Sequence, residues 1–202
     1  MFLRLQDSYD IPVRNGELRH FPDAIPVLET EHLFDVLLGE TPWLQDEVLM
    51  YGKRVKTPRL SAWYGDRPYQ YSGLKLKPKS LTPLLCDLKL RVEKITSNVF
   101  NSVLLNFYRD GADSMSWHSD DEIELGKNPA IASLNLGGTR RFRLRRKDDH
   151  KQTRSIELNA GSVLLMAGAL QHFWQHSVPK TKKPVAPRMN LTFRHILQVP
   201  FE

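Results

Sequence analysis

The sequence predicts a mainly β fold, a sandwich or barrel, with flanking helices. Short runs rich in β-branched and aromatic residues fill the second half of the 202-residue chain, separated by turn residues such as Gly137-Gly138 and Asn159-Ala160-Gly161. Two apolar helical patterns precede them. No repeat, low-complexity tract or change in composition marks a boundary, so we expect one domain over residues 1–202.

The helices and strands are predicted from the spacing of apolar residues. The first helix is expected after Thr30 as its cap and before Gly39 as its end, and the second begins at Thr82-Pro83. Their buried stripes are Leu33, Phe34, Leu37 and Leu38 in the first helix and Leu84, Leu85, Leu88, Val92 and Ile95 in the second. Strands are expected at 103–108, 130–136, 141–146, 155–158, 162–166 and 189–196. Many short strands suit a closed or two-layered β structure.

Composition indicates a basic intracellular protein. Lys and Arg exceed Asp and Glu by 29 − 23 = 6, which favours polyanionic partners. The one cysteine, Cys86, excludes an intrachain disulfide, and the N-terminus has no signal-peptide pattern. The apolar run at 163–170 is far shorter than the ~20 residues of a membrane span. We expect a monomer with no membrane partner, cytoplasmic if bacterial and nuclear if eukaryotic.

His118 and Asp120 are a candidate pair of metal ligands. In an extended chain they point the same way and offer an imidazole and a carboxylate to one ion. A second histidine would complete the 2-His-1-carboxylate set of non-heme Fe(II) oxygenases, which leaves three coordination positions open. A histidine two residues from an aspartate also occurs by chance at surfaces. Spacing does not choose between His172 and His176 as the third ligand, because both share a face of an extended segment.

The segment 188–194 is a candidate anion site. Arg188, Asn190, Thr192 and Arg194 lie on one face of a strand, and the apolar Met189, Leu191 and Phe193 lie on the other. A solvated face has the same alternation. Two guanidinium groups with an amide and a hydroxyl between them also suit a small dicarboxylate. Asn106 and Tyr108 share a face in the same way and could hold the same acid.

These motifs together resemble the AlkB-like Fe(II)/2-oxoglutarate-dependent dioxygenases that repair alkylated nucleic acid, and most closely the animal members that act on DNA. The matching segments, in order, are 51–53, 63–66, 69–73, 106–108, 118–122, 174–179 and 187–194. Only about the first twenty-five residues fall outside the resemblance. It implies a double-stranded β-helix (jelly roll) over 100–202, with a recognition region and two supporting helices within 1–99.

The resemblance implies Fe(II), the co-substrate 2-oxoglutarate and O2 as cofactors. It selects His176, before Ser177-Val178-Pro179, as the third iron ligand beside His118 and Asp120. The residues implied to hold 2-oxoglutarate are Asn106, Tyr108, Arg188, Thr192 and Arg194, with Asn190 as a weaker candidate. Which arginine meets which carboxylate stays open.

The implied reaction removes N-alkyl groups from bases such as 1-methyladenine and 3-methylcytosine in DNA, giving succinate, CO2 and formaldehyde. The target base must be flipped out or already single-stranded.

The candidates for contact with the base are Tyr69, Tyr71, Asp121 and Glu122, and Asp121 is alternatively a loop cap or a partner of the metal ligands. Tyr51, followed by Gly52-Lys53, resembles a finger that fills the gap left by a flipped base; a core-packed tyrosine is the alternative.

Arg141, Arg143 and Arg145 form a row of cations on one strand face, with Phe142 and Leu144 toward the core. A charged row is usually only a solvated face. Their spacing of about 6.6–6.8 Å roughly matches successive phosphates, which favours contact with a nucleic-acid backbone. The candidates to extend this surface are Lys53, Arg54, Lys56 and Arg59. Alternatives are the same iron chemistry on RNA, a protein or a lipid, and a nucleic-acid-binding module without catalysis.

Overall fold

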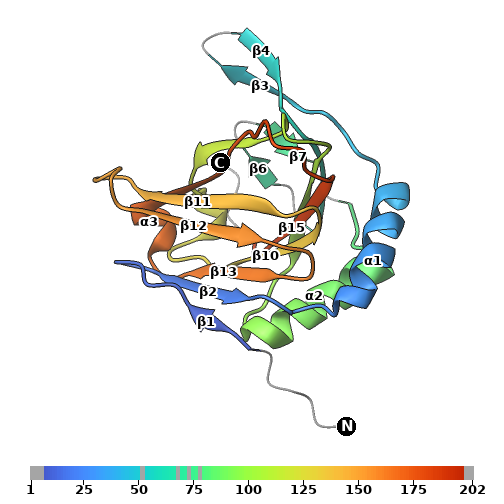
Figure 1. Cartoon of the computed structure of the whole chain (residues 1–202), viewed down its shortest axis with the longest axis horizontal. Helices are drawn as coiled ribbons and strands as arrows, with labels where there is room; N and C mark the ends of the chain where they lie inside the picture. The colour runs from blue at the N-terminus through green and yellow to red at the C-terminus, as the bar shows by residue number, and fades with distance from the viewer. Residues whose placement is uncertain (1–6, 51–52, 67–68, 72–73, 77–78, 198–202) are drawn as a thin grey trace.

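The computed structural model describes residues 7–50, 53–66, 69–71, 74–76 and 79–197, without the side chains of 48–50, 53, 69–71 and 74–76. Two antiparallel sheets face each other as the layers of a jelly roll (Figure 1). The larger contains, in spatial order, β1 (Tyr9–Asp10), β2 (Glu17–Phe21), β13 (Val163–Ala167), β10 (Ile131–Gly137), β15 (Arg188–Arg194), β8 (Ser102–Tyr108) and β5 (Leu60–Gly65). The smaller contains β12 (Thr153–Leu158), β11 (Arg140–Arg146), β14 (Trp174–Val178) and β9 (Met115–His118). The predicted fold class is confirmed.

Two short hairpins lie outside these sheets. They are β3 (Glu47–Met50) with β4 (Lys53–Lys56), and β6 (Tyr69–Tyr71) with β7 (Leu74–Leu76). The β3–β4 hairpin projects from the body of the molecule (Figure 1). Among the described residues, no helix is both long enough and apolar enough to cross a bilayer.

All six predicted strands are present, with ends that differ by at most two residues. Strands β2 and β5 were not predicted. β2 alternates exposed and buried residues over only its first four positions and joins the sheet by pairing with β13, while β5 pairs with β8. Such pairing across the sheet depends on partners distant in sequence, which local propensity does not reveal.

Two helices, α1 (Val27–Glu40) and α2 (Pro83–Thr96), cover the larger sheet (Figure 1). The start of α2 is as predicted, since the Thr82 side chain accepts a hydrogen bond from the Leu85 N–H at 3.2 Å. The predicted ends of α1 were wrong. Pro26 occupies the N-cap, and Thr30 lies inside the helix, where its hydroxyl donates to the Val27 carbonyl at 2.8 Å. Gly39 lies in the last turn rather than after it.

The core has two parts. One packs the helices on the larger sheet, through residues such as Leu33, Leu88 and Leu191. The other fills the space between the two sheets, through residues such as Leu144 and Leu164. The site described below lies at the edge of this second cluster, so its polar groups are positioned by a packed apolar layer.

Replacing Thr82 by alanine should lower the free energy of unfolding by about 1 kcal/mol, because the first turn of α2 loses its side-chain acceptor. Chemical denaturation measures the change. Ser80→Ala, at an exposed position before the helix, is the control and should stay within about 0.5 kcal/mol of wild type. Equal losses in both variants would show that the cap does not stabilise α2.

Candidate active site

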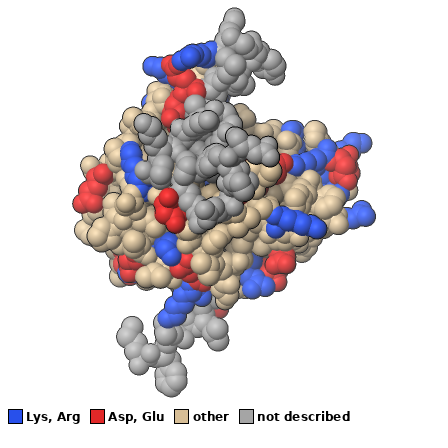
Figure 2. Space-filling view, turned by 180° about the vertical axis from the view of Figure 1, so that it is seen from behind, with Lys and Arg blue, Asp and Glu red and all other residues tan. Residues whose placement is uncertain are grey.

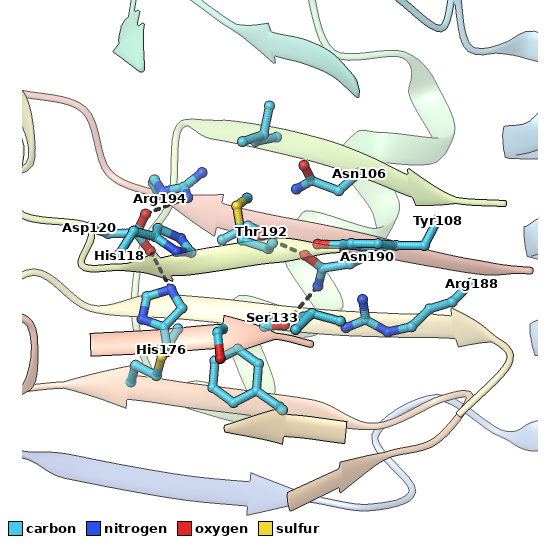
Figure 3. Close-up of a pocket in the computed structure, with 16 residues that line it drawn as sticks. Asn106, Tyr108, His118, Asp120, Ser133, His176, Arg188, Asn190, Thr192 and Arg194 are labelled. Atoms are coloured by element: carbon cyan, nitrogen blue, oxygen red, sulfur yellow. Dashed lines mark hydrogen bonds and ion pairs between the residues drawn. The ribbon is translucent and has the colours of Figure 1, made fainter. Parts of the chain in front are cut away.

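A pocket lies between the two sheets and is lined by both (Figure 3). The larger sheet contributes Leu104, Asn106, Tyr108, Ser133, Met166, Arg188, Asn190, Thr192 and Arg194. The smaller sheet and its loops contribute Met115, His118, Asp120, Phe142, His176, Ser177 and Val178. The predicted alternation along β8 and β15 therefore places the polar face of each strand in one cavity, while Leu105, Met189, Leu191 and Phe193 pack in the core.

The smaller sheet brings His118, Asp120 and His176 together. One potential ligand atom from each lies within 4.8 Å of the others. His118 on β9 and His176 on β14 are register partners, and their ring centroids are 4.2 Å apart. Asp120 Oδ2 is 3.7 Å from His176 Nε2. Two nitrogens and one carboxylate oxygen in this arrangement form a donor set that suits Fe(II) and leaves coordination positions open.

The expectation that His172 shares a strand face with His176 was wrong. His172 lies on the short helix α3 (Leu170–Phe173) and is exposed, while the strand begins only at Trp174. The turn is closed by the His172 N–H, which donates to the Ala169 carbonyl at 3.1 Å. This turn directs the two histidines to different surroundings, and only His176 lines the pocket.

Neighbouring groups fix the orientation of the triad. His118 Nδ1 lies 2.9 Å from the Ser116 carbonyl, so this nitrogen carries the proton and Nε2 keeps a lone pair. The Phe142 ring stacks on His176 at 5.3 Å between centroids. Asp120 is held at two points: its N–H donates to Gln171 Oε1 at 3.0 Å, and its Oδ1 accepts from Arg194 Nη2 at 2.9 Å.

The surroundings also set the ionisation of the triad. Burial lowers the pKa of His118, and burial together with the nearby His118 lowers the pKa of His176 to about 3. Burial raises the pKa of Asp120, but the charge of Arg194 and the two histidines outweigh it and bring the pKa to about 2. At neutral pH the site holds two neutral imidazoles and one carboxylate, the forms in which these groups bind metal ions.

Arg188 is a buried cation at the other end of the same pocket, only 1% exposed (Figure 3). Its Nη2 donates to Asn135 Oδ1, and its guanidinium lies 5.0 Å from the centre of the Tyr108 ring. Its Nε and Nη1 are buried and have no hydrogen-bond partner among the described residues. Since unpaired buried donors on a charged group are costly, these two atoms fit a ligand carboxylate.

A chain of hydrogen bonds lies between Arg188 and the triad (Figure 3). Asn190 Nδ2 donates to Ser133 Oγ at 2.7 Å, and Thr192 Oγ1 donates to Asn190 Oδ1 at 2.9 Å. Both groups of the Asn190 amide are therefore engaged within the protein. This arrangement gives Asn190 a positioning role along the wall of the pocket.

Arg59 corrects another expectation. It was predicted to extend a basic surface, but its side chain is 6% exposed and its Nε donates to Asn106 Oδ1 at 2.7 Å. The expectation failed because the sequence does not show that the residues before β5 lie beside β8. The sequence also gave no role to Ser133, Asn135 or Gln171. Ser133 and Asn135 are polar positions in the otherwise apolar β10, a signal that could have identified them.

The candidates for contact with a substrate base are only partly described. Asp121 has a half-exposed side chain in an ion pair with Lys147 at 3.1 Å, and Glu122 precedes the 3-10 helix η1 (Ile123–Leu125). Neither lines the pocket. Tyr69 and Tyr71 belong to β6, and Lys53 begins β4, but their side chains lie outside the described part of the structure. Tyr51 and Gly52 also lie outside the described residues.

The predicted alternation along β11 is confirmed. Arg141 and Arg143 are exposed and Arg145 is half-buried, whereas Phe142 and Leu144 are buried. Arg141, Arg143 and Arg145, the outer row of β11, are therefore available to a partner on the solvent side of the smaller sheet.

The sequence matches the model of the 2OG-Fe(II) oxygenase superfamily over residues 17–194. The chain belongs to this superfamily. It is 41% identical over 189 residues to mouse alpha-ketoglutarate-dependent dioxygenase alkB homolog 3, an alignment that covers 89% of this chain and 66% of that protein. It is 39% identical over 181 residues to the human DNA oxidative demethylase ALKBH2, covering 84% and 69%. The chain thus spans about two thirds of the length of these relatives, and it is AlkB-like, as its motifs predicted.

A solved structure described as that of OsALKBH1 has the same fold. It superposes with a TM-score of 0.67 over 93% of this chain and 100% of that chain, at 16% sequence identity. The cofactors predicted for this AlkB-like protein are confirmed as those of the superfamily: Fe(II), 2-oxoglutarate and O2. The triad and the buried Arg188 are the two features of the pocket that fit them.

Gln171 offers a test of how the triad is held. Its side chain is 1% exposed, accepts from the Asp120 N–H and donates to Met166 Sδ at 3.8 Å. Gln171→Leu should weaken Fe(II) affinity by about 10–100-fold, the usual cost of losing a group that orients a ligand. Anaerobic calorimetric titration with Fe(II) measures it. Gln175→Leu, at a half-buried position on the neighbouring strand, is the matched control, and an equal loss there would contradict the assignment.

Proposed function

We propose that the protein removes N-alkyl groups oxidatively from nucleobases such as 1-methyladenine and 3-methylcytosine in DNA. The reaction consumes 2-oxoglutarate and O2 and yields succinate, CO2, formaldehyde and the restored base. One observation carries the proposal: the triad and a buried arginine with two unpaired donors share a single pocket.

The positions of the pocket residues support the following proposed roles. His118, Asp120 and His176 hold Fe(II), which with 2-oxoglutarate supplies the oxidising power for attack on an N-alkyl carbon. Arg188 binds the carboxylate of 2-oxoglutarate that lies away from the metal, beside Tyr108. Arg194, next to Asp120, faces the 2-oxo acid end. Asn106 and Thr192 line the space between the two ends.

The two arginines differ in what already neutralises them. Arg194 is paired with the Asp120 carboxylate, whereas Arg188 lies over the Tyr108 ring and has no acidic partner among the described residues. A dicarboxylate bound along β15 therefore compensates the charge of Arg188 most. The buried walls of the pocket exclude water from this interaction and strengthen it.

Nucleic acid is the substrate class that the surface and the relatives favour. The chain has a net charge of +6, and one of its relatives is named a DNA oxidative demethylase. Lys and Arg gather at the projecting hairpin and near the β11–β12 turn, with acidic side chains between them (Figure 2). We propose that Arg141, Arg143 and Arg145, the outer row of β11, contact the backbone of the nucleic acid. Tyr51, Gly52 and Lys53 are proposed to contact it as well. The groups proposed to contact the flipped base are Tyr69, Tyr71, Asp121 and Glu122. Such an activity belongs inside the cell and needs only one copy of the chain.

The test is release of formaldehyde and succinate from an oligodeoxynucleotide that contains 1-methyladenine, with Fe(II), 2-oxoglutarate and ascorbate. We expect equal amounts of both products from wild type and neither from His118→Ala. Succinate without formaldehyde would retain the oxygenase and refute the substrate. The same sequence made as RNA compares the two nucleic acids, and faster turnover of the RNA would contradict the assignment to DNA.

A further inference from the structure

A second groove lies beside the active-site pocket, on the solvent side of the smaller sheet. It is lined by residues 114–117 around β9, by Arg143 of β11 and by residues 177–180 at the end of β14. Met115, Ser177 and Val178 line both cavities, so the groove adjoins the pocket. The ladder between β9 and β14 is irregular between His176 and Val178, which locates this groove beside the triad.

Trp117 forms one wall of the groove and is held in place by cations. The Arg145 guanidinium lies 4.4 Å and that of Arg143 5.5 Å from the centre of a Trp117 ring. Gln175 Oε1 fixes Arg145 by accepting two hydrogen bonds, at 3.1 and 2.9 Å. A fixed indole beside positive charges is the combination with which proteins bind single-stranded nucleic acid, because bases stack on the ring and phosphates bind the cations.

The cations along β11 are not equivalent. Arg141 is ion-paired with Glu157 at 2.9 Å, and Arg145 is hydrogen-bonded to Gln175. Arg143, by contrast, has no hydrogen-bond acceptor or acidic partner among the described residues, and neither has the exposed Lys180, which also lines the groove. A phosphate in the groove therefore meets two cations that no acidic side chain of the described residues neutralises.

We propose that this groove binds the nucleotide next to the target base, with its phosphate between Arg143 and Lys180 and its base against Trp117. The inference rests on the proposed function and identifies the part of the substrate strand that the protein holds outside the pocket. Trp117 directly precedes His118, and Ser177 directly follows His176. Because the groove and the pocket also share Met115, Ser177 and Val178 as lining residues, a nucleotide in the groove would adjoin one whose base enters the pocket.

The first experiment measures binding of an unmodified, fluorescently labelled single-stranded oligodeoxynucleotide by anisotropy, without turnover. Arg143→Gln and Trp117→Leu should each weaken binding by about tenfold, and Trp117→Phe should restore most of the affinity. Arg143→Gln should also reduce the salt slope by about one, and the loss should exceed that of Arg141→Gln. Lys94→Gln, which removes one charge from the exposed side of α2, is the control. Binding within twofold of wild type in both groove variants would overturn the proposal.

The second experiment separates this inference from the proposed function. KM for a methylated oligonucleotide should rise about tenfold in Arg143→Gln, while turnover of a methylated mononucleotide, which has no neighbouring nucleotide, should not change. Equal losses on both substrates would indicate a disturbed triad and overturn the groove. If wild type released no formaldehyde but the variants still lost affinity, the groove would stand and the proposed function would fail.

Discussion

Replacing His176 by alanine should lower turnover by at least about 100-fold. The imidazole supplies one of only three protein donors in the triad, and losing a group that merely orients such a donor already costs about 10–100-fold. The remaining pair, His118 and Asp120, supplies only two protein donors and should bind the metal more weakly. Succinate release measures turnover, and anaerobic calorimetry measures Fe(II) affinity.

His172→Ala is the matched control for this variant. Both histidines precede the Ser177-Val178-Pro179 element, but His172 is exposed on α3 and outside the pocket. We expect turnover and Fe(II) affinity within about twofold of wild type. If His172→Ala lost as much turnover and Fe(II) affinity as His176→Ala, the position of His172 outside the pocket would be contradicted. The choice between His172 and His176 as the third ligand would then be open again.

The parts of the site that the sequence predicted are those that depend on strand alternation. Side chains on a strand alternate with a period of two, so the polar face of β15 follows directly from its seven residues once the strand is assigned. The same argument holds for β11, where every second side chain is buried. Both predictions needed no knowledge of what lies across the sheet.

The parts that the sequence missed depend on chain segments that meet only after folding. Arg59 contacts Asn106, which is 47 positions away, and Gln171 contacts Asp120, which is 51 positions away. A lone arginine after a proline is expected at the surface, and burial becomes favourable only because Asn106 supplies an acceptor. The prediction that His172 shares a strand face with His176 failed for a related reason. One turn of α3 interrupts a segment whose sequence predicts an extended chain. Local pattern cannot reveal either effect.

Replacing Arg188 by methionine should raise KM for 2-oxoglutarate by about 100-fold, because the pocket loses the buried donors Nε and Nη1 that fit a carboxylate. KM for the methylated oligonucleotide should stay the same, since Arg188 lies at the far end of the pocket from any base. Arg188→Lys should recover little, because an ammonium group cannot form the two parallel hydrogen bonds of a guanidinium group. Steady-state assays with each substrate varied in turn separate these effects.

Arg188→Met should weaken 2-oxoglutarate binding without lowering the melting temperature of the substrate-free protein. Arg188 is fully buried and its charge is not neutralised by an acid among the described residues, so burial lowers its pKa and opposes folding. Methionine has a similar shape and no charge, and we expect Tm without 2-oxoglutarate to remain equal to wild type or to rise by a few degrees. Added 2-oxoglutarate should raise Tm of the wild-type protein but not of Arg188→Met. A large fall in Tm without 2-oxoglutarate would show that Arg188 stabilises the fold through Asn135 and Tyr108 instead of being held ready for a ligand.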